Sequence, residues 1–317
     1  MLRVNISIPK PEKNRLSSHP KNIFKQRKKD PVSFSEKGKE RQREMVWLMN
    51  HHLHHHQLPR WNKARIWAGT SLIWLIFMWV TPKISHSPQH HLFADMRNFL
   101  GVPNTLNVIT NFPFLVVGVL GFVLCVKGEF FNISLRGEVW GWALFYAGIT
   151  GVAFGSAYYH LKPCDDRVVW DTLPMMMAYS SLFSSCLIER VGEKIGLTCL
   201  FALILAAFLS TAYERFYNDL RLCMMFQLIP SVAISVIAFV YRPKYTHSRY
   251  WFWATGVYLI SKFEAIADKK IYNSNHYFVS GHSLGHLCSS LVPVLLSVML
   301  IYRTKKCQRL GETKERP

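Results

Sequence analysis

Residues 138–160 read EVWGWALFYAGITGVAFGSAYYH, an apolar stretch that ends in a serine and a histidine. Its length matches the roughly 20 residues that an α-helix needs to cross a bilayer. Ser156 and His160 are four positions apart, so they lie on one face of such a helix. Because ionisable groups are unfavourable inside a bilayer, polar residues on one face of a span indicate a functional site.

The rest of the chain has the same apolar character. It contains 317 residues, of which 50% are hydrophobic and only 18% are charged, and the apolar residues come in long blocks. This composition is typical of a polytopic membrane protein, so we predict an all-α bundle of transmembrane helices. Eight spans are expected, at residues 66–82, 105–126, 138–160, 170–188, 195–213, 222–241, 250–268 and 280–302.

Basic residues gather in the first part of the chain. The net charge is +19, and residues 1–65 contain sixteen Lys and Arg against five Asp and Glu, a balance of +11. This segment has few large apolar side chains, so we expect a disordered cytosolic tail, with an alternative start at Met45 left open. Basic flanks of spans explain the charge without a nucleic-acid partner. By the positive-inside rule both termini, including a basic tail at 303–317, are cytosolic.

Cysteine is a less suitable metal ligand here than histidine. The seven cysteines are scattered, form no C-x-x-C pair and mostly lie within apolar segments, so no disulfide framework is expected. The run HHLHHH at 51–56 lies in the basic tail, where metal binding is the less favoured interpretation.

Two further pieces complete the candidate site. Asp171 follows His160 by eleven residues at the start of the next span, and His282 and His286 open the last span, again four positions apart. With cytosolic termini, the end of the third span and the starts of the fourth and eighth lie on the opposite, lumenal or external, side. All these residues are therefore expected near one membrane face.

These residue types suit metal-assisted hydrolysis. Three neutral imidazoles, here His160, His282 and His286, make a tetrahedral zinc site with an open position for water, whose pKa the metal lowers. A carboxylate that is not a ligand, such as Asp171, takes the proton. A hydroxyl such as that of Ser156 stabilises the developing oxyanion.

Each of these residues alone also has a plain structural interpretation. His160 by itself is more often an interfacial or hydrogen-bonded histidine, and His282 with His286 also suits a proton relay. Serine, as at Ser156, is common at helix contacts in membranes, and Asp171 suits a helix N-cap. Only the combination is specific for a metal site.

Other polar residues are expected to support the site. Glu264 and Asp268 are candidates to accept hydrogen bonds from imidazole N–H groups, with pairing to Lys262 within the same helix as the plainer alternative. His276 is a reserve ligand. Interhelical hydrogen bonding is expected for three asparagines at the start of the second span, Asn104, Asn107 and Asn111.

The motif Ser156-x-x-x-His160, the aspartate eleven residues later and His282-x-x-x-His286 resemble the pattern of the alkaline ceramidase family. That family belongs to a superfamily of seven-span membrane hydrolases that includes the adiponectin receptors. The stretch 155–189 looks especially like the less characterised ceramidase-like membrane proteins. The resemblance covers about residues 95–302, which implies a seven-span hydrolase core there and makes 66–82 an extra N-terminal span.

The resemblance implies zinc at the three histidines, with Asp171 and Ser156 assisting catalysis. It also implies hydrolysis of the amide of ceramide, or of a ceramide-like lipid from the bilayer, to a long-chain base and a fatty acid. We expect an endomembrane location, the endoplasmic reticulum or Golgi, with the site near the lumenal face. The acidic, Trp-containing segment that binds calcium in better-known members is not visible before the second span, where Asp95 and Asn104 stand. The resemblance therefore gives no ground for calcium regulation.

Two other classes of function stay open. One is a non-enzymatic receptor or scaffold that keeps a structural metal, and the other is a proton-coupled transporter that uses the histidines as a relay. The predicted orientation also places the glycosylation sequon Asn132-Ile-Ser134 in the cytosol, where it should stay unmodified.

Overall fold

The computed structural model describes residue 72 and residues 76–305. The predicted tail at 1–65, most of the predicted span 66–82 and residues 306–317 lie outside the described residues, while residues 76–80 are helical. The chain divides into two units, 1–73 and 74–317, and the second unit contains every element named below.

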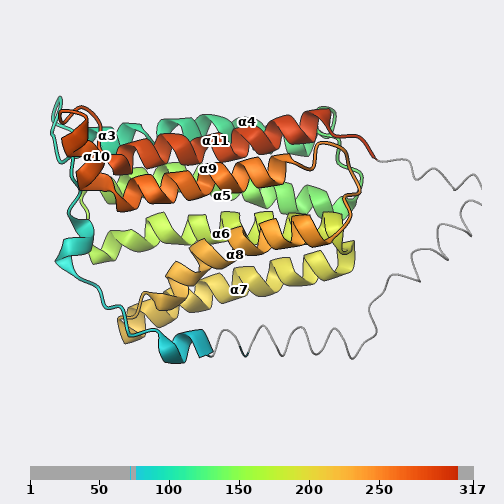
Figure 1. Ribbon diagram of the computed structural model, residues 1–317, viewed down its shortest axis with the longest axis horizontal. Coiled ribbons are helices and arrows are strands. Elements are labelled where there is room, and N and C mark those ends of the chain that lie inside the picture. The colour runs from blue at the N-terminus through green and yellow to red at the C-terminus, as the bar shows by residue number, and fades with distance from the viewer. Residues whose placement is uncertain (1–71, 73–75, 306–317) are drawn as a thin grey trace, which may run out of the picture. The chain divides into compact units, whose positions relative to one another are not determined.

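The second unit is built from long helices that lie side by side (Figure 1). Each of the seven segments from 105 to 302 that were predicted as spans is helical over most of its length, and no strand is assigned in residues 76–305. The all-α prediction is therefore confirmed. The elements are η1 (Pro88–His91), α3 (Thr105–Ile109), α4 (Phe112–Lys127), α5 (Arg136–Leu161), α6 (Asp165–Arg190), α7 (Glu193–Tyr217), α8 (Arg221–Val240), α9 (Tyr250–Ile266), α10 (Asp268–Ser274) and α11 (Gly281–Tyr302).

Four helical stretches in the described residues are long and apolar enough to cross a membrane: Thr105–Lys127, which joins α3 and α4, and the helices α7, α8 and α11. Helix α6 is equally long, but it buries four serines, Ser180, Ser181, Ser184 and Ser185. Small polar residues are favoured where membrane helices contact one another instead of lipid. The apolar helices indicate a membrane-embedded protein.

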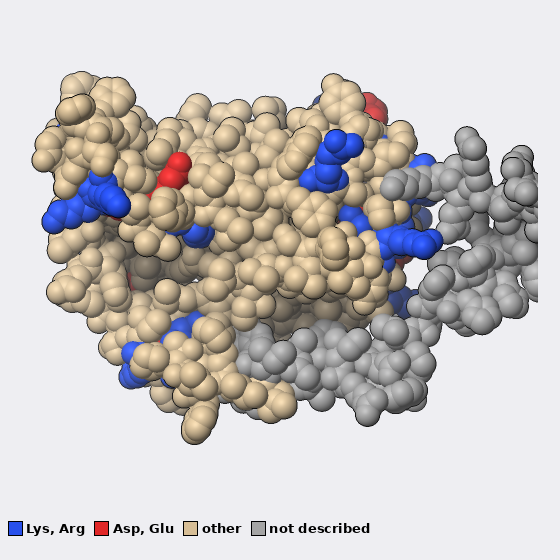
Figure 2. Space-filling view, viewed as in Figure 1, with Lys and Arg blue, Asp and Glu red and all other residues tan. Residues whose placement is uncertain are grey.

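The outward-facing surface of the bundle is also apolar. Large side chains such as Phe201, Leu205 and Phe239 are 70%, 61% and 83% exposed. Figure 2 shows Lys, Arg, Asp and Glu towards the two ends of the helices, with a band between them that has no charged side chain on this face. Such a band suits the hydrocarbon layer of a bilayer, where exposed charges are strongly unfavourable.

Buried ion pairs join three segments at the helix ends opposite α3 and α10. The Arg303 side chain, directly after α11, is 1% exposed, and its guanidinium lies 3.0 Å from Glu138 Oε2 and 3.4 Å from Glu189 Oε2. Arg303 Nε also donates to the carbonyl of Asn132 at 2.9 Å. Arg303, which was predicted to begin the C-terminal tail, is therefore part of the folded core.

Candidate metal centre and cavity

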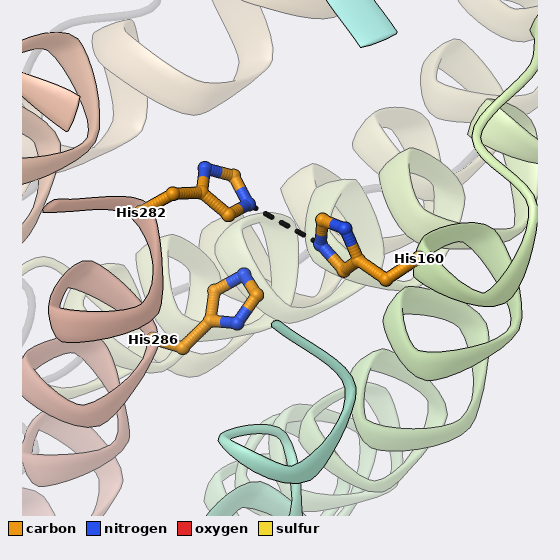
Figure 3. A group of neighbouring side chains, drawn as sticks. All are labelled: His160, His282 and His286. Atoms are coloured by element: carbon orange, nitrogen blue, oxygen red, sulfur yellow. Dashed lines mark hydrogen bonds between the residues drawn. The ribbon is translucent and has the colours of Figure 1, made fainter. Parts of the chain in front are cut away.

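Three histidines meet at the end of the bundle that holds α3 and α10 (Figure 3). His160 lies in the last turn of α5, and His282 and His286 lie in the first two turns of α11. The Nε2 atoms of His160 and His282 are 3.2 Å apart, and one ring nitrogen from each of the three histidines lies within 4.8 Å of the others. The structure thus brings together the three residues predicted as ligands.

The start of α11 is fixed by close backbone packing. A Cβ atom at Gly281 would lie 2.2 Å from the Glu264 carbonyl, so only glycine allows α11 to approach α9 this closely. The Asp268 carboxylate accepts two further hydrogen bonds. Its Oδ1 accepts from the backbone amide of His282 at 2.8 Å, and its Oδ2 accepts from the backbone amide of Ala94 at 2.7 Å. These contacts fix the position of His282 relative to the end of α9.

The supporting roles predicted for two carboxylates are wrong in detail. Asp268 accepts from the backbone amide of His282 and not from an imidazole. Glu264 interacts with the thiol of Cys288 on the neighbouring turn of α11. Both residues face α11 as expected, but Asp268 meets a backbone amide, and Glu264 lies beside a thiol whose hydrogen bond goes to the Val257 carbonyl.

Short helix α3 links the two helices that carry the histidines. Asn104 Nδ2 donates to the carbonyl of His160 at 2.8 Å. Asn107, which is fully buried, accepts from Ser283 Oγ at 2.6 Å. These two asparagines therefore make the interhelical bonds that were expected, whereas Asn111 donates to the nearby carbonyl of Asn107 at 2.7 Å.

Thr110 sets the tautomer of one histidine, a role that sequence reasoning missed. Its hydroxyl donates to the Leu106 carbonyl at 2.7 Å, so its oxygen accepts from His286 Nδ1 at 3.1 Å. An N–H at Nδ1 leaves the Nε2 lone pair of His286 free for a metal. The available signal was the position of Thr110, three residues after Asn107 and therefore on the same helical face.

Phe93 covers the histidines from the loop before α3, and it too was missed. Its ring centroid lies 4.7 Å from that of His160 and 4.5 Å from that of His282. The same loop is held by His91, whose ring nitrogens lie 2.8 Å from Tyr159 Oη and 2.8 Å from Asp165 Oδ1. An irregular loop gives no periodic signal, so this cover could not be read from the sequence.

Asp95 in this loop is already paired. Its side chain is 2% exposed, and Arg97 Nε and Nη2 donate to its two oxygens at 2.8 and 2.7 Å. Burial works to raise the pKa of Asp95, but the hydrogen bonds and charge of Arg97 outweigh it and hold this pKa below its usual value. Both oxygens of the Asp95 carboxylate are therefore paired with the Arg97 guanidinium.

Asp171 and Ser156 lie next to each other where α5 and α6 touch. The Ser156 side chain interacts with the Asp171 carboxylate, and both residues line the same cavity. A Cβ at Gly155 would lie 1.8 Å from the Trp170 carbonyl, so the two helices can approach this closely only because residue 155 is glycine. Helix α6 begins at Asp165, so Asp171 lies within the helix and the N-cap interpretation is wrong.

A cavity of about 420 Å³ connects these groups. Its lining includes Ser156, Asp171, His282 and His286, together with many apolar side chains from α5, α6, α8, α9 and α11. His276, the reserve ligand, lies in an exposed turn with φ of 59° and is not part of the histidine cluster. The polar groups therefore face a largely apolar chamber.

The three histidines fit a zinc ion by donor type and spacing. Tetrahedral zinc with imidazole ligands at 2.0–2.1 Å requires nitrogens about 3.3 Å apart. The separation of 3.2 Å between His160 and His282 Nε2 agrees with this, and the ligand atoms of all three histidines lie within 4.8 Å of one another. His160 Nδ1 is buried without a hydrogen-bond partner among the described residues.

Comparison with known proteins adds no assignment to this geometry. No family model matches the chain, and no curated protein matches it.

Proposed function

We propose that this protein is an integral-membrane, zinc-dependent hydrolase that cleaves the amide bond of a ceramide-like lipid. One observation carries the proposal: three imidazoles converge, and two of them, His282 and His286, line a mainly apolar cavity together with Asp171 and Ser156. The spacing of these five residues, which resembles that of the alkaline ceramidases, supports the same conclusion. A purely structural metal needs neither the carboxylate nor the cavity.

The proposal includes a topology. In it the seven helical segments between 105 and 302 all cross the membrane, with one further span at 66–82. Both termini face the cytosol, and the histidines lie near the lumenal face of an endomembrane. The location of every candidate residue at one end of the bundle supports this arrangement (Figure 1).

The chemistry follows from the roles that each side chain can take. Zinc, when bound, supplies a Lewis acid for the amide carbonyl and lowers the pKa of a water molecule. Asp171 accepts a proton from the attacking water and passes it to the leaving amine. Once Asp171 carries that proton, it can donate to Ser156 Oγ, which frees the Ser156 hydroxyl hydrogen to donate to the carbonyl oxygen as negative charge develops there.

The shape of the cavity supports a lipid substrate. Its apolar lining includes Phe145, Val152, Met175 and Trp251, which suit an acyl chain, while the polar residues are placed where a head group would meet the metal. The large apolar side chains on the outside of the bundle suit contact with the bilayer, where such a substrate is found.

Lipid turnover by the purified full-length protein tests the proposal. Mass spectrometry should detect a long-chain base and a fatty acid from at least one lipid amide in a panel of ceramides and related lipids. His282→Ala should abolish this turnover and the bound zinc, whereas His276→Asn, at an exposed turn that suits asparagine, should change neither. Full turnover by His282→Ala would refute the proposal.

A further inference from the structure

One cation, Lys262 on α9, lines the cavity, and Asp171 is the only carboxylate among the lining residues that the structure describes. Lys262 Nζ donates to Gln227 Oε1 on α8 at 3.0 Å and lies 5.3 Å from the ring centroid of Tyr258. The ammonium group is thus held on the cavity wall by neutral neighbours.

No Asp or Glu oxygen among the described residues lies within 4.0 Å of Lys262 Nζ. The lysine does interact electrostatically, at longer range, with Asp171, His282 and His286. An ammonium group without a close counter-ion is unfavourable within a membrane bundle, and one that faces a metal centre also opposes metal binding. An anion bound between the lysine and the histidines removes both penalties.

Gln227 suits the same ligand. Because its Oε1 accepts from Lys262, its amide group keeps two N–H donors that this contact does not use. A lysine and an amide side by side offer a positive charge and fixed donors, which is the chemistry that binds a carboxylate or a phosphate. Apolar residues such as Met175 and Ile234 elsewhere in the cavity suit a long alkyl chain.

We propose that Lys262 and Gln227 form a subsite for an anionic group, a carboxylate or a phosphate, on the long-chain lipid that occupies this cavity. The preferred substrate is then an acidic member of the ceramide-like lipid amides. The position of the amide at the histidines rests on the proposed function, but the anion subsite itself does not.

Equilibrium binding to the full-length protein tests the subsite without turnover. The probes are palmitate, hexadecyl phosphate and hexadecanol, which share one alkyl chain and differ in the charged group. Because charge-assisted hydrogen bonds contribute about 1.5–3 kcal/mol, the wild type should bind at least one acidic probe roughly ten- to hundredfold more tightly than the alcohol. The better acidic probe shows whether the subsite prefers carboxylate or phosphate.

Lys262→Met should lose most of this preference and keep its affinity for hexadecanol. Lys269→Met, which removes an exposed charge on α10, is the matched control and should behave as wild type. Zinc content is measured for each variant, because a metal also attracts acids and must be equal in the proteins compared.

Two results would overturn the subsite: a wild type that binds alcohol and acids equally well, or a Lys262→Met protein that keeps the preference. The wild-type result does not depend on how well any variant folds. If the preference holds while no lipid amide is hydrolysed, the subsite stands and the hydrolase proposal fails.

Discussion

The Nε2 atoms of His160 and His282 lie 3.2 Å apart, although 122 residues separate them in the chain. His160 lies in the last turn of α5 and His282 in the first turn of α11. The candidate metal centre therefore depends on these two helix ends being held next to each other. The hydrogen bonds of Asn104 and Asn107 provide much of that hold.

Thr110→Val should weaken zinc binding while leaving the ligands in place. It removes the oxygen that accepts from His286 Nδ1, and loss of such a partner typically lowers metal affinity by about 10- to 100-fold. Competition with a zinc chelator of known affinity measures the effect. Thr198→Val, at an exposed threonine of α7 that bonds only within its helix, is the control and should bind zinc as wild type does.

Gly155→Ala should reduce stability and turnover together. The added Cβ meets the Trp170 carbonyl, so α5 and α6 must separate beside Ser156 and Asp171, at a cost of about 1–3 kcal/mol. Gly256→Ala, in α9 with no atom within 4 Å of the new Cβ, should be neutral or slightly stabilising because alanine favours helix. Thermal unfolding in detergent compares the two, and equal midpoints would contradict the proposed close packing.

Arg303→Met should destabilise the protein without affecting the metal. It leaves Glu138 and Glu189 buried without their shared cation, which typically costs about 3–5 kcal/mol. Because Arg303 directly follows the C-terminal end of α11, whereas His282 and His286 lie in its first two turns, zinc bound per folded molecule should stay unchanged. Arg136→Met, at an exposed arginine, should keep wild-type stability; a similar loss there would mean that positive charge at this end, not the buried pairs, is responsible.

The proposed orientation predicts which residues are accessible from the cytosol. Arg242→Cys, between α8 and α9, should react with a membrane-impermeant maleimide added to sealed microsomes, and Lys270→Cys, on α10, should react only after permeabilisation. The protein without either substitution shows how much labelling comes from its native cysteines. Asn132 should carry no glycan. A glycan on Asn132, or the reverse labelling pattern, would place the histidines at the cytosolic face.

Much of the fold was predictable because apolar segments of about 20 residues are a strong signal for membrane helices. The helical segments from 105 to 302 appear close to where they were expected, and only four meet the length and hydropathy of a membrane span. The serines of α6 explain part of the difference, since they face other helices and lower the apolar character of a buried segment.

The convergence of the three histidines was predicted from helical spacing and the expected orientation of the spans, and the structure brings them together. Their surroundings were not predictable in the same way. Phe93 belongs to an irregular loop that has no periodic pattern. Thr110, directly after α3, shares a helical face with Asn107, but its spacing alone did not show that it would meet His286. The place of Lys262 on the cavity wall could not be predicted, because it depends on how α8 and α9 pack against each other.

The most direct test of the central claim is lipid turnover and zinc content measured together for Asp171→Asn. The account predicts stoichiometric zinc with turnover reduced by about 10²- to 10⁴-fold, because the substitution removes the proton acceptor and leaves the ligands intact. Asp166→Asn, whose carboxylate is 95% exposed on the same helix, should retain both zinc and turnover. Wild-type turnover by Asp171→Asn, with zinc bound, would contradict the account.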